Sequence, residues 1–113
     1  MKIKTTEKYE AVIIELKGNV MGGEDTKVFN EHLHKLIEED KKQIVIDLSS
    51  VKFMNSSGLG MLIGGLTTLK KADGVLKLAR VTDKIESLLI ITKLITIFDS
   101  YDTVDEAVQA FAS

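Results

Sequence analysis

The sequence predicts a single small α/β domain with a mostly parallel sheet of four or five strands, an N-terminal antiparallel hairpin and about four helices. Short apolar runs typical of strands alternate with stretches of helical periodicity, which is the pattern of parallel strands joined by right-handed crossovers. The chain has 113 residues and a hydrophobic content of 44%, which is enough to bury one core without disulfides. We therefore expect residues 1–113 to form one domain.

The hairpin is expected from two runs near the start of the chain. Residues 2–6 form the first predicted strand and residues 11–17 the second, in which apolar side chains alternate on one face. The connection is short enough for an antiparallel pair, and Gly18 with Asn19 would end the second strand as a turn. A surface helix follows, because apolar residues then recur at helical spacing at Val28, Phe29, Leu33, Leu36 and Ile37.

The middle of the chain predicts a buried strand and a long helix. Residues 44–48 are apolar on both faces apart from Asp47, as in a central strand covered on two sides. A helix is expected from about residue 57 to residue 71, followed by another short strand at 75–79. These elements would form the centre of the sheet and one of its covering helices.

The C-terminal third predicts two capped helices around a last strand. Asp83 and Glu86 have the spacing of a capping box, and Thr103 and Glu106 repeat that spacing. Between them, residues 96–98 are expected to form the closing strand. The chain would then end in an amphipathic helix.

Composition excludes several classes of function. The chain contains no cysteine, which rules out disulfides and thiolate chemistry and fits a cytoplasmic protein. We expect no membrane insertion, because the longest uncharged apolar run is interrupted by serines, threonines and four glycines. The net charge is −2 with no basic stripe, so direct nucleic-acid binding is not expected. A protein or a small ligand is the expected partner.

The most informative stretch is the predicted strand that leads into a serine-containing helix start. Ser56 and Ser57 precede a helical run of leucines, so their side chains would lie among backbone N–H groups that have no partner within the helix. A phosphate on Ser56 would be stabilised by those N–H groups and by the helix dipole. The simpler alternative is that both serines only cap the helix.

Glycines are unusually frequent in this predicted helix. Gly60 and Gly64 are spaced so that they would let the helix approach the sheet or another helix closely. Alternatively, Gly58 keeps the serine turn open to the backbone of a partner. A phosphate-binding nucleotide loop is not indicated, because its glycine and lysine pattern is absent.

Catalytic and metal-binding alternatives are weak. The chain has no nucleophile elbow around a serine, and a nucleophilic Ser56 would need a base within hydrogen-bonding reach. His32 and His34 are two residues apart on a helix, so they would not share a metal ion and are expected to be solvated. Met21 and Met54 are expected at the same end of the sheet, either as adaptable contacts for a partner or as core residues.

Residues 47–60, DLSSVKFMNSSGLG, resemble the strand, serine loop and helix start of STAS domains from bacterial anti-sigma factor antagonists. The similarity extends over nearly the whole chain. It implies a STAS-like fold without catalysis or cofactor, and a protein that captures an anti-sigma factor of the histidine-kinase-like ATPase type and thereby frees a sigma factor. That partner would phosphorylate Ser56 to end the capture, and a metal-dependent serine phosphatase would reset the cycle. The residues expected to bind the partner are Met21, Gly22, Met54, Asn55, Ser56, Ser57, Gly58 and Leu59.

Two positions depart from the family's pattern. Asn55 stands where the family typically has an aspartate before the serine, and Met21 lies in a loop that often carries another aspartate. Both changes remove negative charge near Ser56. An accessory subunit of a membrane transporter, or a small-molecule sensor, without phosphorylation at Ser56, is therefore the alternative function.

Overall fold

The computed structural model describes residues 1–112, which form five strands, four α-helices and one 3₁₀ turn. The elements are β1 (Lys2–Lys8), β2 (Ala11–Val20), α1 (Glu24–Glu38), β3 (Gln43–Met54), α2 (Ser56–Lys71), β4 (Val75–Ala79), α3 (Asp83–Ile91), η1 (Leu94–Thr96), β5 (Asp99–Tyr101) and α4 (Val104–Ala110).

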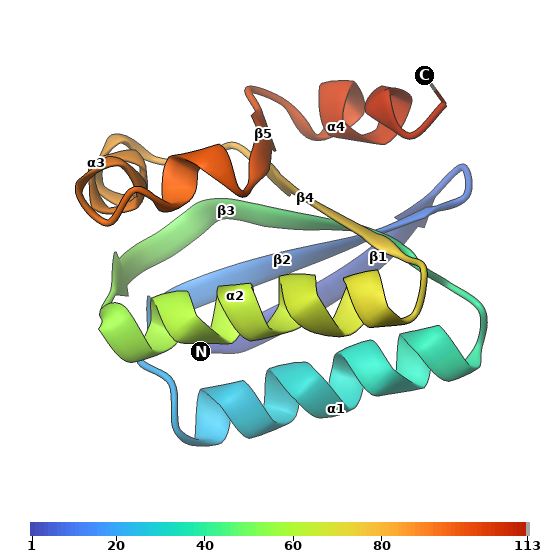
Figure 1. The fold of residues 1–113 in the computed structure, drawn as a ribbon, viewed down its shortest axis with the longest axis horizontal. Coiled ribbons are helices and arrows are strands. Elements are labelled where there is room, and N and C mark those ends of the chain that lie inside the picture. The colour runs from blue at the N-terminus through green and yellow to red at the C-terminus, as the bar shows by residue number, and fades with distance from the viewer. Residues whose placement is uncertain (113) are drawn as a thin grey trace.

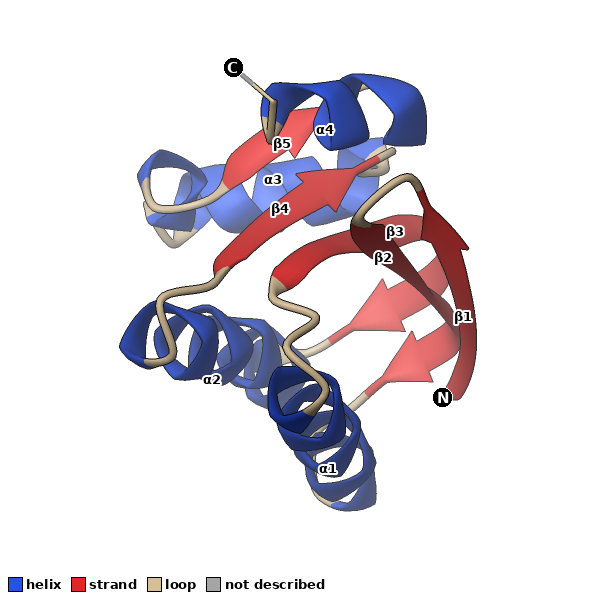
Figure 2. Ribbon diagram, turned by 90° about the vertical axis from the view of Figure 1, so that its right-hand side faces the viewer, coloured by secondary structure: helices blue, strands red, loops and turns tan. Residues whose placement is uncertain are grey.

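The five strands form one mixed sheet in the order β1-β2-β3-β4-β5. β1 pairs with β2 in antiparallel orientation, and the three other pairs are parallel. Helices α1 and α2 lie side by side on one face of the sheet, and α4 lies on the opposite face (Figures 1 and 2). The predicted fold class, including the N-terminal hairpin, is confirmed.

The main core lies between the sheet and the pair α1 and α2. Phe29 and Leu33 of α1 and Leu62 and Leu69 of α2 are completely buried against the aliphatic side chains of β2, β3 and β4. A smaller cluster on the other face joins α4 to the sheet through Ala11, Ile13, Val45, Ala79, Ala107 and Val108. Burial on both faces explains why the central strand β3 is apolar on both sides.

The predicted turn at Gly18 and Asn19 is wrong, because β2 continues through these residues to Val20. The register with β3 shifts twice along this stretch, and Gly18 has a φ of +88°. Such irregularities bend a strand without ending its pairing, which short-range turn signals do not reveal. β3 is also longer than expected and ends at Met54, which pairs with Val20.

The last strand also differs from the prediction. Residues 94–96 form the 3₁₀ turn η1, and β5 begins only at Asp99. Phe98, which was expected in the strand, is 4% exposed and belongs to the main core. Burial of Phe98 before the strand starts shifts the pairing, so that Asp99 becomes the partner of Lys77. A run of β-branched residues predicts a strand nearby, but it does not show whether the strand begins before or after Phe98.

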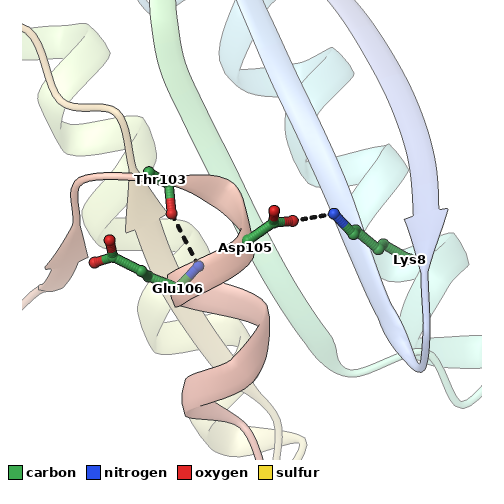
Figure 3. Close-up of polar contacts among 4 residues, drawn as sticks. All are labelled: Lys8, Thr103, Asp105 and Glu106. Atoms are coloured by element: carbon green, nitrogen blue, oxygen red, sulfur yellow. Dashed lines mark hydrogen bonds and ion pairs between the residues drawn. The ribbon is translucent and has the colours of Figure 1, made fainter.

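The helix caps follow the sequence pattern in one of two cases. Thr103 caps α4, since its hydroxyl accepts a 3.0 Å hydrogen bond from the N–H of Glu106 (Figure 3). α3, however, is capped by Thr82 and not by Asp83. The exposed side chains of Lys8 and Asp105 form an ion pair that joins the end of β1 to α4 (Figure 3). This pair raises the pKa of Lys8, chiefly through the hydrogen bond to Asp105.

Candidate functional site

The turn between β3 and α2 is held by Asn55, and not by the serines that follow it. Asn55 occupies the N-cap position with extended backbone angles, and its side-chain Oδ1 accepts a 2.8 Å hydrogen bond from the N–H of Gly58. Its own carbonyl accepts from Leu59 at 2.9 Å. The alternative in which the serines cap the helix is therefore wrong, because asparagine, itself a favoured cap, lies one residue earlier.

Ser56 and Ser57 are the first two residues of α2, and both are exposed. Within residues 1–112, the side chain of neither serine makes a hydrogen bond. Their backbone N–H groups point out of the first turn of a sixteen-residue helix and lack partners within it. The two hydroxyl groups thus lie beside free backbone donors and are not needed to hold the turn together.

Two glycines bring the loop after β2 directly against this helix start. A Cβ atom on Gly58 would lie 2.1 Å from the carbonyl oxygen of Val20, and that oxygen also accepts a 3.3 Å hydrogen bond from Asn55. A Cβ atom on Gly22 would lie 2.6 Å from the Cβ of Ser57, and Gly22 has a φ of +81°. Only glycine fits at either place. The exposed surface at Ser56 therefore continues onto the loop that carries Met21.

Close packing of Gly60 and Gly64 was predicted, and this prediction is wrong. A Cβ atom on either residue would have no heavy atom within 4 Å. Gly65 makes the tight helix contact instead, because a Cβ there would lie 2.8 Å from Cε2 of Phe29 and 3.1 Å from Cδ1 of Leu33. Gly58 and Gly65 are seven residues apart and share the inward face, whereas Gly60 and Gly64 lie off it.

The other residues expected to bind a partner divide into exposed and supporting groups. Met21 is 46% exposed, whereas Met54 is 6% and Leu59 3% exposed. The structure thus settles the two alternatives for the methionines, with Met21 on the surface and Met54 in the core. Gly22 and Gly58 are also buried. Contact with a partner would involve Met21, Ser56 and Ser57 directly, and the buried residues shape the surface beneath them.

Charge is sparse at this helix start. The first turn of α2 contains no acidic residue. The carboxylate of Asp25 accepts a 3.2 Å hydrogen bond from the N–H of Met21 and lies 3.5 Å from the amino group of Met1. Asp25 therefore fastens the loop after β2 to the chain start. Its spacing of four residues from Met21 was the sequence signal for this contact.

The histidines take no part in this site. The Nε2 of His32 lies 2.8 Å from the hydroxyl of Thr5 on β1, and burial is the main reason why the pKa of His32 is lowered. His34 is exposed, as expected, while His32 is half-buried. No carboxylate or imidazole among residues 1–112 makes a hydrogen bond with the Ser56 hydroxyl. In the same part of the chain, none of the helices has the length and apolar content needed to cross a bilayer.

Comparison with known proteins identifies the family. The model of the STAS domain matches residues 2–107. The chain belongs to the STAS domain family. A protein of Thermotoga maritima named as an anti-sigma factor antagonist is 27% identical to this STAS domain over 96 residues, which cover 80% of the chain and 85% of that protein. The anti-sigma-B factor antagonist of Staphylococcus aureus is 34% identical over 64 residues, which cover 57% and 59% of the two chains.

Solved structures show the same fold. The crystal structure of an anti-sigma factor antagonist from Thermotoga maritima superposes with a TM-score of 0.87 at 22% identity, covering 98% of this STAS domain and 95% of that chain. The Bacillus cell fate determinant SpoIIAA in its phosphorylated form gives a TM-score of 0.74 at 19% identity, covering 97% and 99%. The resemblance to STAS domains predicted from residues 47–60 is confirmed.

Proposed function

We propose that this STAS domain is a cytoplasmic anti-sigma factor antagonist that is switched by phosphorylation at Ser56. In its unmodified form it captures an anti-sigma factor of the histidine-kinase-like ATPase type, which frees a sigma factor for transcription. Phosphorylation by that same partner ends the capture, and a metal-dependent serine phosphatase restores it. The domain acts as a binding module and contributes no catalysis.

The exposed position of Ser56 is the observation that supports this proposal most directly. Its hydroxyl is accessible at the first position of α2 and makes no hydrogen bond within residues 1–112. Because Asn55 caps the helix, Ser56 can be modified without loss of the hydrogen bond that holds the turn. A kinase could therefore reach the hydroxyl in the folded domain.

The helix start favours the modified state locally. Phosphoserine carries about −1.5 to −2 charges at neutral pH, and it would lie beside the free N–H groups and the positive end of the α2 dipole. The same charge in the middle of a docked surface would oppose binding through repulsion and desolvation. Release of the partner then requires no refolding of the domain.

Asn55 and Met21 increase the contrast between the two states. Neither is charged, and the first turn of α2 has no carboxylate. The phosphate would be the first negative charge in that turn. The surface would thus change from neutral and partly apolar, with Met21 46% exposed, to strongly negative at its centre.

The experiment mixes the purified domain with each histidine-kinase-like anti-sigma factor of its source organism, with and without ATP. We expect one of them to bind, intact mass and peptide mapping to find a single phosphate on Ser56, and Ser56→Asp to weaken binding by about tenfold or more. Ser100→Asp is the matched control, because Ser100 is also exposed but lies on β5.

Phosphate at another residue, or equal binding by Ser56→Asp and the wild type, would contradict the switch. If none of the anti-sigma factors binds, the alternative function as a transporter accessory subunit or small-molecule sensor gains support. Genes of transporter components next to the gene for this chain would point the same way.

A further inference from the structure

An apolar groove lies beside the serine turn, between the end of β3 and the first turns of α3. It has a volume of about 250 Å³ and is lined by Phe53, Met54, Lys84, Ile85 and Leu88. In Figure 1 the tip of β3 lies between the start of α2 and helix α3. The groove therefore opens at the same end of the sheet as Ser56.

The groove exposes more apolar surface than the fold requires. Ile85 and Met54 form a buried base, at 3% and 6% exposure, while the large ring of Phe53 is 47% exposed at its rim. Aromatic side chains next to a pocket are characteristic of the parts of a surface that contribute most to protein binding. Phe53 thus adds a contact surface as well as a wall.

The charge at the rim is positive. Lys84 is the only charged side chain that lines the groove among the described residues. It forms no ion pair within residues 1–112, although Asp83 and Glu86 share the first turn of α3 with it. A cation in the first turn of a helix is also disfavoured by the helix dipole. A carboxylate from a partner would pair with Lys84 and would offset its unfavourable interaction with the helix dipole.

The groove is continuous with the surface around Ser56. Phe53 and Ser56 are three residues apart, so the chain between them spans at most about 10 Å. A standard protein interface covers about 800 Å² on each partner. A patch of that size centred on Ser56 extends farther than the distance to Phe53. A protein that covers Ser56 would thus cover the groove as well.

We propose that this groove receives an apolar side chain next to an acidic one from the same protein partner that docks on Ser56. The inference rests on the proposed function and adds the chemistry of the partner. The apolar side chain fills the space between Phe53 and Leu88, and the acidic one pairs with Lys84. The partner surface opposite this chain is therefore acidic and apolar at that point, and the Ser56 loop forms the switched half of the interface.

The test measures the dissociation constant for the anti-sigma factor that binds wild-type protein in the experiment above. We expect Phe53→Ser to weaken binding by about tenfold or more, since a half-exposed aromatic ring becomes buried in the complex. Lys84→Glu should weaken it several-fold at about 0.05 M NaCl, with a smaller effect at about 0.5 M, because salt screens charge pairs.

Matched controls are available elsewhere on the surface. Tyr9→Ser removes an aromatic side chain that is 87% exposed at the hairpin turn, at the opposite end of β2 from the serine turn (Figure 1). Lys93→Glu reverses an exposed charge after α3. Both should bind like the wild type, and thermal unfolding should show that all four variants are folded.

The outcomes separate the two proposals. If the wild type binds and Ser56→Asp does not, but Phe53→Ser and Lys84→Glu bind like the wild type, the groove proposal is wrong while the switch stands. Stronger binding by Lys84→Glu would also overturn the acidic chemistry. A dimer of this chain that depends on Phe53 and competes with the partner would show that a second copy occupies the groove instead. If none of the anti-sigma factors tested binds the wild-type domain, the switch itself is refuted.

Discussion

Oδ1 of Asn55 accepts a 2.8 Å hydrogen bond from the N–H of Gly58, and this bond closes the turn that presents Ser56. The cap depends on a side-chain oxygen and not on a charge. Asparagine at this position therefore holds the helix start without placing a negative charge beside the serine. The residue that supports the turn is therefore not the serine for which we propose phosphorylation.

Loss of the Asn55 cap should destabilise the domain. We expect Asn55→Ala to lower the free energy of unfolding by about 1 kcal/mol, because the N–H of Gly58 loses its acceptor. Asn55→Asp keeps the acceptor and adds a charge that the helix dipole favours, so its stability should equal or exceed that of the wild type by about 0.3–1 kcal/mol. Urea denaturation measures both variants. An Asn55→Ala protein as stable as the wild type would contradict the assigned cap.

Gly58 and Gly60 form a matched pair in the first turns of α2. Gly58→Ala should lower the free energy of unfolding by about 1–3 kcal/mol or more, because its Cβ would lie 2.1 Å from the carbonyl oxygen of Val20. Gly60→Ala meets no atom within 4 Å and should stabilise the helix by up to about 1 kcal/mol. Chemical denaturation of the two variants gives the signs. Equal effects on stability would show that the close approach of Gly58 to Val20 is wrong.

Gly65 and Gly64 provide the same comparison at the contact between α1 and α2. Gly65→Ala places a Cβ 2.8 Å from the ring of Phe29, and we expect a loss of about 1–3 kcal/mol from overpacking. Gly64→Ala adds a methyl group in open space and should be neutral or stabilising, by up to about 1 kcal/mol. The thermal midpoint should therefore fall for Gly65→Ala and stay equal or rise for Gly64→Ala. A larger loss for Gly64→Ala would mean that α2 is rotated relative to the structure.

Because of His32, the stability of the domain should depend on pH in the mildly acidic range. Burial lowers the pKa of His32 below the ordinary value of 6.5, so the folded state prefers the neutral ring. The unfolded chain then binds more protons as the pH falls through 6.5, and stability is lost from there down to the lower pKa of the folded state. Above 6.5 both states hold the neutral ring, and this contribution is complete.

The measurement compares the thermal midpoint of the wild type with that of His32→Gln at several pH values. Their difference should shift against the wild type as the pH falls from about 7.5 to about 5. His34→Gln is the matched control, since His34 is exposed on the same helix. Parallel pH profiles for the wild type and His32→Gln would contradict the assignment.

The local signals in the sequence predicted the elements well and their ends less well. The alternating apolar residues of 11–17 located β2, because burial on a face repeats every second residue in a strand. The continuous apolar run of 44–48 located β3, as expected for a strand covered on both faces. It did not locate their ends, since Gly18 is a turn signal in isolation and part of a bulged strand in the sheet. Phe98 was likewise predicted to lie in the last strand, but it precedes that strand and its side chain is buried in the main core.

The candidate site was predicted in position and only partly in structure. The motif located Ser56 at a helix start, which is a local property of a strand, a polar turn and a leucine-rich helix. The alternative in which the serines cap the helix was wrong, because Asn55 provides the cap. The groove beside Phe53 was not predicted, because Lys84 and Leu88 are distant in sequence and reach the turn only through the packing of α3 on β3.

The sequence by itself determined the fold class, the family resemblance and the exposed serine at the start of α2. These properties follow from short-range patterns of burial, capping and motif that each segment carries alone. The tertiary structure decided which glycines pack, which methionine is exposed, and what surrounds Ser56. Those features depend on contacts between residues far apart in the chain, such as Gly22 with Ser57 and Gly65 with Phe29, and such contacts exist only after the sheet and helices have packed together.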